Sequence, residues 1–190
     1  MNQNKLPNRQ SIRLQGYDYS CPGFYFITFC TYRREHLFGE ILNGKMILNR
    51  FGEVAYNEWI KTESIRDNVI LDSFVVMPNH IHGIIEIIDV DNKSVGVNCN
   101  LPLRDHTNND HTIYRTKFES PSNNIGAIIR GYKSSVTKQI NIIRKTPGTK
   151  IWHRNYYDHI IRDERSLFYI REYINNNPEN WQKDGFRSTR

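Results

Sequence analysis

The 190-residue chain has no apolar run long enough to cross a membrane and no signal-peptide pattern at its start. We therefore expect a cytoplasmic protein without a membrane partner. Cysteine is also scarce: Cys21, Cys30 and Cys99 are odd in number and lack the spacing of metal ligands. Free thiols in a reducing compartment are expected rather than a disulfide framework.

What the chain does have is basic and aromatic side chains. Lys and Arg outnumber Asp and Glu by 26 to 20, and the aromatic residues, which make up 12% of the chain, include 11 tyrosines. A basic, tyrosine-rich chain without a membrane anchor is compatible with a nucleic-acid partner. Charge alone does not distinguish this class from other soluble proteins.

The length predicts a single domain over residues 1–190. Two stretches lack the hydrophobic period of a folded element. Residues 1–15 are predicted to form a flexible N-terminal segment. Residues 89–124, rich in Asn, Asp, Thr and Ser, are predicted to form a long mobile surface insertion.

The remaining periodicity predicts strands and helices in alternation. β-branched and aromatic runs indicate strands, and apolar residues at three- and four-residue spacing indicate helices. The expected elements are a strand at 24–32, a turn at Asn43-Gly44, a helix capped by Asn49, paired strands at 69–77 and 81–88, a helix at 125–143, a short strand at 157–161, and a helix at 164–176 capped by Asp163 and stopped by Pro178. This order predicts an α+β fold, a ferredoxin-like antiparallel sheet with its helices on one face.

His80-Ile81-His82 lies at the start of the second paired strand. Residues i and i+2 of a strand share a face, so His80 and His82 project together while Ile81 points to the core. Two neighbouring imidazoles can supply two ligands to one divalent metal ion. The alternative is a pair of polar residues on the open face of an antiparallel strand.

A second group lies on the last helix. Tyr169, Tyr173 and Asn177 are spaced by four and therefore line one helix face. The amide oxygen of Asn177 is a suitable ligand for a hard divalent cation. Alternatively, Tyr173 packs against the sheet and Asn177 caps the helix before Pro178.

Four motifs now stand in order along the chain. They are Met77-Pro78-Asn79-His80-Ile81-His82, Gly131-Tyr132-Lys133-Ser134, Trp152 to Arg162, and Tyr173-Ile174-Asn175-Asn176-Asn177-Pro178. Together with Ser11 to Leu14, Tyr17 to Ser20 and Tyr25 to Thr28, they resemble the REP-associated tyrosine transposases. These are relatives of the insertion-sequence single-tyrosine transposases of the His-hydrophobic-His (HUH) class. The resemblance covers almost the whole chain except residues 89–124.

The resemblance implies a role for each matching residue. His80 and His82 would be metal ligands, Tyr173 the nucleophile, and Asn177 the third protein ligand. Better-known relatives often have Gln in that last role, and Asn is shorter by one methylene. Tyr132, which also lies on a helix near basic residues, is the rival nucleophile. The metal would be Mg²⁺ or Mn²⁺, with Mn²⁺ favoured by the imidazole nitrogens; zinc stays open.

The function implied is that of a metal-dependent single-stranded DNA transesterase. It would nick and rejoin hairpin or palindromic elements through a 5′-phosphotyrosine, as a monomer or a homodimer. A non-catalytic binding module of the same fold and a metal-dependent phosphodiester hydrolase are the alternatives. The candidate DNA contacts are basic residues for the backbone (Arg9, Arg13, Lys133, Lys138, Arg154 and Arg162) and aromatic residues for stacking on bases (Trp152, Tyr156 and Tyr157).

Overall fold

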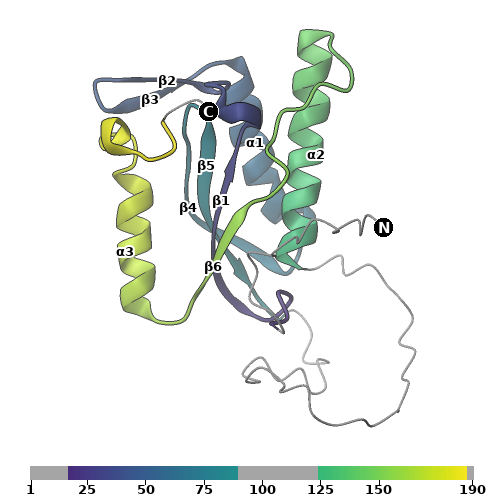
Figure 1. Ribbon diagram of the computed structural model, residues 1–190. Helices are drawn as coiled ribbons and strands as arrows, with labels where there is room; N and C mark the ends of the chain where they lie inside the picture. The colour runs from purple at the N-terminus through teal and green to yellow at the C-terminus, as the bar shows by residue number, and fades with distance from the viewer. Residues whose placement is uncertain (1–16, 90–123, 188–190) are drawn as a thin grey trace, which may run out of the picture.

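A four-stranded antiparallel sheet forms the centre of the computed structural model, which describes residues 17–89 and 124–187 (Figure 1). Its strands are β1 (Gly23–Cys30), β4 (Val69–Val76), β5 (His80–Ile87) and β6 (Tyr157–Ile161), in the order β4-β5-β1-β6. Every neighbouring pair is antiparallel. The predicted α+β class and ferredoxin-like sheet are confirmed.

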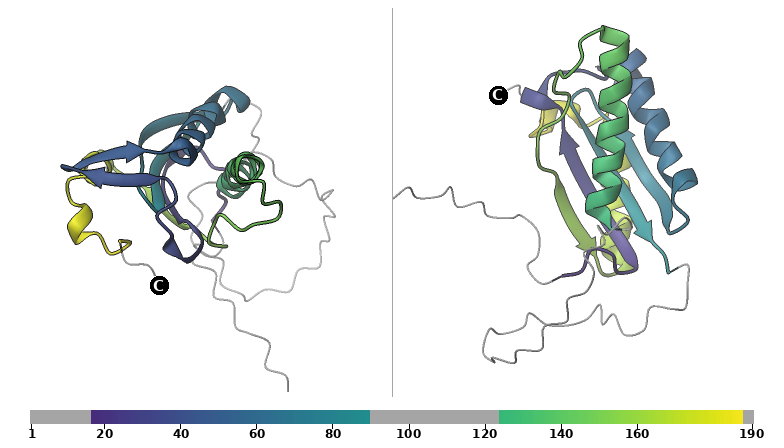
Figure 2. Two further views of the ribbon diagram at one scale, coloured as in Figure 1. Left: turned by 90° about the horizontal axis from the view of Figure 1, so that it is seen from above. Right: turned by 90° about the vertical axis from the view of Figure 1, so that its right-hand side faces the viewer.

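Helices α1 (Arg50–Ile65) and α2 (Ile125–Arg144) pack side by side on one face of the sheet (Figure 2). They bury the large apolar side chains that alternate along β1, namely Tyr25, Ile27 and Phe29. The side chain of Asn49 accepts hydrogen bonds from two backbone N–H groups of the first turn of α1, so the predicted N-cap is confirmed. This face contains most of the hydrophobic core.

Helix α3 (Glu164–Asn175) lies on the opposite face. Its buried Leu167 and Ile174 pack with Ile84 of β5. The side chain of Asp163 caps the helix by accepting from the Ser166 N–H, as predicted. The prediction that all helices lie on one face of the sheet is therefore right for α1 and α2 but wrong for α3. Helix α3 covers the other face, on which the metal site was expected.

Shorter elements surround one end of the sheet. Strands β2 (Gly39–Leu42) and β3 (Lys45–Leu48) form the predicted hairpin, and its turn residues Asn43 and Gly44 both have positive φ, 50° and 73°. Two single-turn helices, η1 (Tyr32–Arg34) and η2 (Trp181–Lys183), complete the described elements. After α3 the chain returns to η1, where Arg34 donates to the Gly185 carbonyl at 2.9 Å.

Several predictions fall outside the described residues. The N-terminal segment with Arg9 and Arg13 lies there, as does the insertion apart from its two end residues. Cys30 is a free thiol, but Cys21 is disulfide-bonded, so the expectation of free thiols is wrong for Cys21. No helix in the described part of the chain is long and apolar enough to cross a bilayer.

Candidate metal centre and nucleophile

His80 and His82 lie side by side on the face of β5 that carries α3. Ile81 between them packs into the core beneath α1 and α2, as the alternation predicted. The imidazoles are 0% and 1% exposed, and their ring centroids are 4.5 Å apart. The shared face predicted from the sequence is confirmed. Because both imidazoles are buried, the alternative of two polar residues on an open, solvent-exposed face is excluded.

Asn79 fixes which nitrogen of His80 carries the proton. The Asn79 amide nitrogen donates to the carbonyls of Arg34 and Phe186, at 3.2 and 2.7 Å, so its oxygen must face the ring. That oxygen lies 2.8 Å from His80 Nδ1 and can only accept. Nδ1 is therefore the donor, and His80 Nε2 presents a lone pair to the site.

His82 is held in the same way by Thr28 of β1. Its Nδ1 lies 2.7 Å from Thr28 Oγ1, and its Nε2 lies 3.1 Å from the Tyr173 hydroxyl. With the proton on Nδ1, Thr28 accepts from the ring and Nε2 is free to accept from Tyr173. A hydrogen-bond partner on the far nitrogen is the usual arrangement behind a metal-binding histidine.

The environment keeps both imidazoles neutral. Burial lowers the pKa of His82 to about 3. Burial, followed by the nearby His82 and Arg34, lowers the pKa of His80 well below 6.5. Neutral imidazole is the form that binds a metal ion, so at physiological pH no proton has to leave first.

Asp184, which the sequence analysis did not identify, completes the cluster. Its Oδ1 accepts from the Phe186 N–H at 2.7 Å, and its Oδ2 lies 3.5 Å from His80 Nε2. Burial raises the pKa of this carboxyl. One ligand atom from each of His80, His82 and Asp184 lies within 4.8 Å of the others, so the group can hold a metal ion.

Unsatisfied polar atoms support this assignment. His80 Nε2 and Asp184 Oδ2 are both buried without a hydrogen-bond partner. A lone pair facing a carboxylate oxygen is repulsive unless a proton or a cation lies between them. Two neutral imidazoles with a carboxylate are a common ligand set for divalent transition metals, so the residues fit such an ion.

Asn177 lies one turn beyond Tyr173 and is 3% exposed, with its Oδ1 buried and unpartnered. Burial and the nearby Asp184 raise the pKa of the Tyr173 phenol, whereas the neighbouring Asn177 side chain lowers it. The net shift is upward, so the Tyr173 hydroxyl is protonated at neutral pH. The structure thus brings Tyr173 and Asn177 together with the histidines.

The rival nucleophile Tyr132 is excluded by its position. Tyr132 is 4% exposed, and its hydroxyl donates to the Ala55 carbonyl at 2.8 Å, inside the core between α1 and α2. Trp152, which was predicted to stack on bases, is only 9% exposed. Its ring is packed against Phe29 and Phe38, and its Nε1 donates to the Lys133 carbonyl.

The other residues predicted to contact DNA differ in how exposed their side chains are. Lys138, Arg154, Arg162 and Tyr157 are exposed, and Tyr156 is half-buried. The Lys133 ammonium instead donates to the carbonyls of His153 and Asn155, at 3.1 and 3.2 Å, and burial lowers its pKa to about 8.

A weak sequence signal does point to Asp184. The Asp184-Gly185 pair indicates a turn, and Trp181 and Phe186 on either side indicate that the segment folds back onto the protein. Both aromatic rings pack against His80, with centroids 6.1 and 4.9 Å from the imidazole. Periodicity could not place this turn beside β5, because it belongs to no long helix or strand.

No protein-family model matches the chain. An uncharacterised protein of Haemophilus influenzae is 42% identical over 181 residues, which cover 94% of this chain and 93% of that one. The structure of a REP-associated tyrosine transposase bound to a REP hairpin aligns with a TM-score of 0.56 and 17% identity, over 90% of this chain and 74% of that chain. A structure from Deinococcus radiodurans, described as a candidate transposase, reaches a TM-score of only 0.45. The chain therefore belongs to the family of the Haemophilus influenzae protein, and it has the fold of the REP-associated tyrosine transposase, as its motifs predicted.

Proposed function

We propose that this protein is a metal-dependent transesterase that nicks and rejoins single-stranded DNA at hairpin or palindromic elements in the cytoplasm. The observation that carries the proposal is the Tyr173 hydroxyl, 3.1 Å from His82 Nε2, beside a buried group that can hold a metal ion. The fold shared with a transposase bound to a REP hairpin supports the same role.

Four side chains would hold the metal ion, which we propose to be Mg²⁺ or Mn²⁺. His80 and His82 offer nitrogen, and Asp184 and Asn177 offer oxygen atoms that lack any other partner. Bound there, the ion would polarise a phosphate oxygen and stabilise the negative charge of the transition state. Asn79 and Thr28 would keep both rings oriented toward it.

Tyr173 supplies the nucleophile in this proposal. Its phenol oxygen bonds to phosphorus, the bond from phosphorus to the 3′ oxygen breaks, and the phenol proton is balanced by the proton that the 3′ oxygen gains. The products are a 5′-phosphotyrosine and a free 3′-hydroxyl, so the bond energy is kept and a second 3′-hydroxyl can reverse the step. The neighbouring Asn177 side chain, which lowers the pKa of Tyr173, would favour the phenolate form during attack.

Arg34 is a further candidate for contact with the scissile phosphate. One nitrogen of its guanidinium donates to the Gly185 carbonyl, and its charge is close enough to shift the pKa values of His80 and Asp184. Arg33 and Arg34 both have φ of 55°, a strained conformation for residues other than glycine. Such strain is often found at functional sites.

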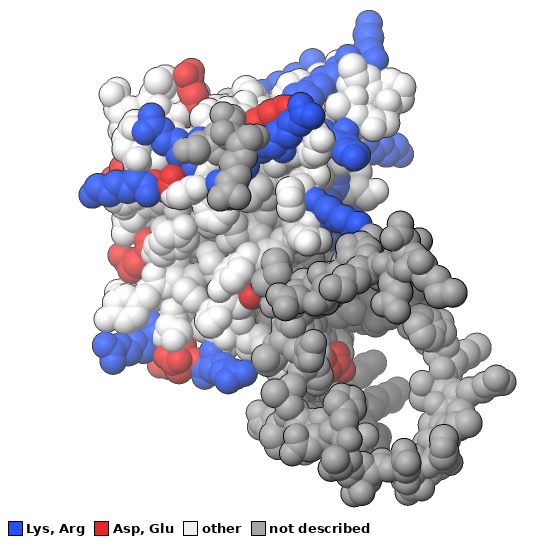
Figure 3. Space-filling view, in the orientation of Figure 1, with Lys and Arg blue, Asp and Glu red and all other residues white. Residues whose placement is uncertain are grey.

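The surface around the site suits a single strand. Tyr157 of β6 is 47% exposed and contacts Phe26, whose ring in turn stacks on His82. Aromatic rings beside basic side chains are the usual surface for unpaired nucleotides. In Figure 3, Lys and Arg side chains are spread across the upper part of the visible face.

The test is formation of a covalent protein–DNA product. The full-length protein would be incubated with Mn²⁺ and an end-labelled DNA hairpin flanked by randomised unpaired segments, then run on a denaturing protein gel. We expect a DNA-linked band that Tyr173→Phe and a chelator both abolish. Tyr169→Phe is the matched control, because Tyr169 lies one turn earlier on α3, is 57% exposed, and is not among the proposed site residues.

Other outcomes would assign a different function. Cleavage without a linked band, retained by Tyr173→Phe, would indicate a metal-dependent hydrolase. Binding without cleavage or linkage would indicate a nucleic-acid-binding module. A linked band that persists in Tyr173→Phe would move the nucleophile to another residue.

A further inference from the structure

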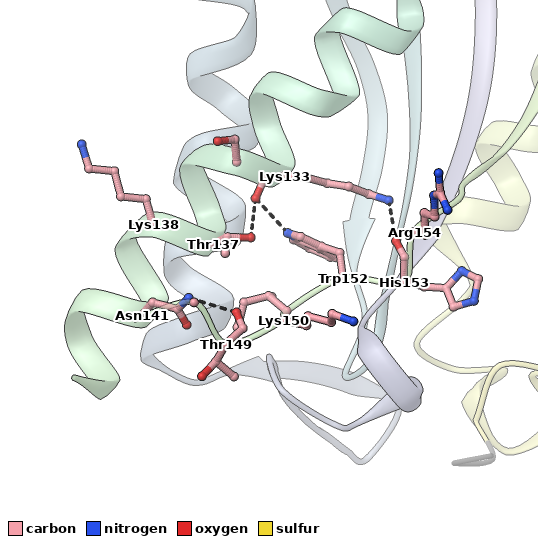
Figure 4. Close-up of a pocket in the computed structure, with 12 residues that line it drawn as sticks. Lys133, Thr137, Lys138, Asn141, Thr149, Lys150, Trp152, His153 and Arg154 are labelled. Atoms are coloured by element: carbon pink, nitrogen blue, oxygen red, sulfur yellow. Dashed lines mark hydrogen bonds between the residues drawn. The ribbon is translucent and has the colours of Figure 1, made fainter. Parts of the chain in front are cut away.

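A pocket of about 540 Å³ lies between the C-terminal half of α2 and residues 148–154 (Figure 4). Helix α2 covers the face of the sheet opposite α3, and the residues that line the pocket include none from the metal centre. Its volume is within the range of about 300–1,000 Å³ that is usual for ligand sites. A ligand bound here would therefore be separate from the reaction at Tyr173.

The charged residues that line the pocket are all basic. Lys150 and Arg154 are exposed on one wall, two residues before and two residues after Trp152, and Lys138 is exposed on α2. None of these three cations forms an ion pair in the part of the chain that the structure describes. The pocket therefore favours an anionic ligand, either a carboxylate or a phosphate.

The wall that contains Trp152 is an extended segment with one free edge. On its other edge, the Ile151 carbonyl and the His153 N–H form backbone hydrogen bonds of 2.8 and 2.9 Å, on either side of an antiparallel bridge between Trp152 and Thr31. In such a pair the N–H and C=O of the two bridged residues point away from each other. The Trp152 N–H and C=O thus point away from the sheet, and neither has a backbone partner among the described residues.

Asn141, on the α2 wall, is a second acceptor without a donor. Its Nδ2 donates to the Thr149 carbonyl at 3.0 Å, which fixes the orientation of the amide. Its Oδ1 is buried without a partner, and the residue is only 8% exposed. Carboxylates and phosphodiesters can only accept hydrogen bonds, so an anionic group alone satisfies neither Asn141 Oδ1 nor the Trp152 carbonyl. The ligand must also carry N–H donors.

An acidic peptide in an extended conformation has all of these features. Its backbone supplies N–H donors for the Trp152 carbonyl and Asn141 Oδ1, and a carbonyl for the Trp152 N–H. Added as a further strand beside residues 150–154, it would bring acidic side chains next to Lys150 and Arg154. A sugar–phosphate backbone has no N–H donors, so a nucleic acid would leave the free edge at Trp152 unpaired.

We propose that this pocket binds an acidic segment of a partner protein as an extended strand. The segment pairs with the Trp152 backbone, donates to Asn141 Oδ1, and places carboxylates at Lys150 and Arg154. A second copy of this chain is a poor source of such a segment, because no stretch of five residues in its sequence contains three acidic residues. The proposal goes beyond the proposed function and does not rest on it, since it involves neither the metal ion nor the cut DNA strand.

The test measures, by fluorescence polarisation and without DNA, how a labelled nonapeptide of alternating Glu and Thr binds the full-length protein. We expect tighter binding than that of the matching Gln and Thr peptide, and about tenfold weaker binding when the backbone nitrogens are methylated. The double variant Lys150→Gln and Arg154→Gln should weaken binding about tenfold and reduce its salt dependence, because two ion pairs are lost. Asn141→Leu should also weaken binding about tenfold, at unchanged salt dependence, because the lost contact is a neutral hydrogen bond.

The double variant Arg130→Gln and Lys45→Gln is the matched control, because it removes two charges from exposed positions outside the pocket. The proposal is overturned if the Glu peptide binds no tighter than the Gln peptide, or if the pocket double variant matches this control. It is also overturned if Asn141→Leu, melting as the wild type does, loses no affinity.

Competition with DNA separates the peptide from a nucleic acid. If oligothymidylate of the same charge displaces the labelled peptide at a lower concentration than the unlabelled peptide does, the pocket is a nucleic-acid site and the proposal is wrong. The two proposals of function fail independently. Loss of the Tyr173-linked DNA band would refute the transesterase alone, and a linked band without peptide binding would refute the peptide site alone.

Discussion

The two faces of the sheet are built from alternate residues of the same strands, yet they contain different chemistry. On β5, Ile81 and Ile85 join the apolar cluster beneath α1 and α2, while His80 and His82 face α3. The α3 side has only a small buried apolar cluster, which includes Ile84. Next to it lie three buried polar atoms without partners, on His80, Asp184 and Asn177.

The difference shows which face stabilises the fold and which is available for chemistry. A buried polar atom without a partner costs about 1–3 kcal/mol of stability. Three such atoms at one place are hard to explain by folding alone, because native proteins satisfy nearly all of their buried polar groups. The apolar face offsets this cost, and the α3 face keeps its unpaired atoms for a ligand.

The largest effect on stability is expected on the apolar face, at Gly83. A Cβ atom there would lie 2.5 Å from a ring carbon of Trp59, which is fully buried and cannot move aside. Gly83→Ala should lower the free energy of unfolding by about 1–3 kcal/mol. Urea denaturation would measure this loss, and the folded fraction should still form the DNA-linked product. An unchanged midpoint would mean that the apolar face is less tightly packed than this contact indicates.

The sequence predicted the apolar face well because its pattern is local. The periods of the strands and helices, the caps Asn49 and Asp163, and the Asn43-Gly44 turn each depend on neighbours a few residues away. The predicted helix at 125–143 corresponds to α2, Ile125–Arg144. The shared face of His80 and His82 follows from the same kind of local pattern, the alternation along a strand.

The α3 face was predicted less completely because its residues come from segments far apart in the chain. Asp184 reaches His80 only through the segment that follows α3, and no period marks that segment. Trp152 and Lys133 were expected to contact DNA through ring and charge, but they hydrogen-bond the protein's own backbone carbonyls. The residue types indicated that these side chains could bind DNA. Only the tertiary contacts could show which of them already hydrogen-bond to other parts of the protein.

A second prediction tests the α3 face through the partner of His82. Thr28→Val keeps the shape of the side chain but removes the hydroxyl that holds His82 Nδ1. Loss of such a partner typically weakens metal binding about 10–100-fold. Titration with Mn²⁺, followed by calorimetry or by the signal of the free ion in electron paramagnetic resonance, would measure this change.

Thr62→Val is the matched control on the opposite side of the sheet. Thr62 is also buried, and its hydroxyl donates to the Glu58 carbonyl within α1. We expect this variant to bind Mn²⁺ as the wild type does. Equal losses in the two variants would attribute the effect of Thr28 to general destabilisation rather than to the orientation of His82.

The smallest effect is expected where α3 is fastened to the sheet. Arg171 of α3 donates two hydrogen bonds to Asp72 of β4, with its Nε 2.9 Å from Asp72 Oδ1, and the Asp72 pKa is lowered mainly by these bonds. A carboxyl whose pKa is lower in the folded state stabilises the fold above its unfolded pKa of about 3.9, and this contribution is lost as the pH falls through the folded pKa. Arg171 is 42% exposed, so Asp72→Asn should cost at most about 1 kcal/mol at pH 7.

Urea unfolding of wild type and Asp72→Asn at pH 7 and at pH 3 would measure the pair directly. The difference between the two proteins should shrink as the pH falls below the unfolded pKa of about 3.9, and it should disappear once the pH is below the lowered folded pKa of Asp72. Asp67→Asn, at an exposed position just before β4, should show no difference at either pH. A difference for Asp72→Asn that persists unchanged at pH 3 would mean that shape and hydrogen bonding, rather than charge, hold α3 over the metal centre. The site would then keep its helix, and with it Tyr173, under acidic conditions.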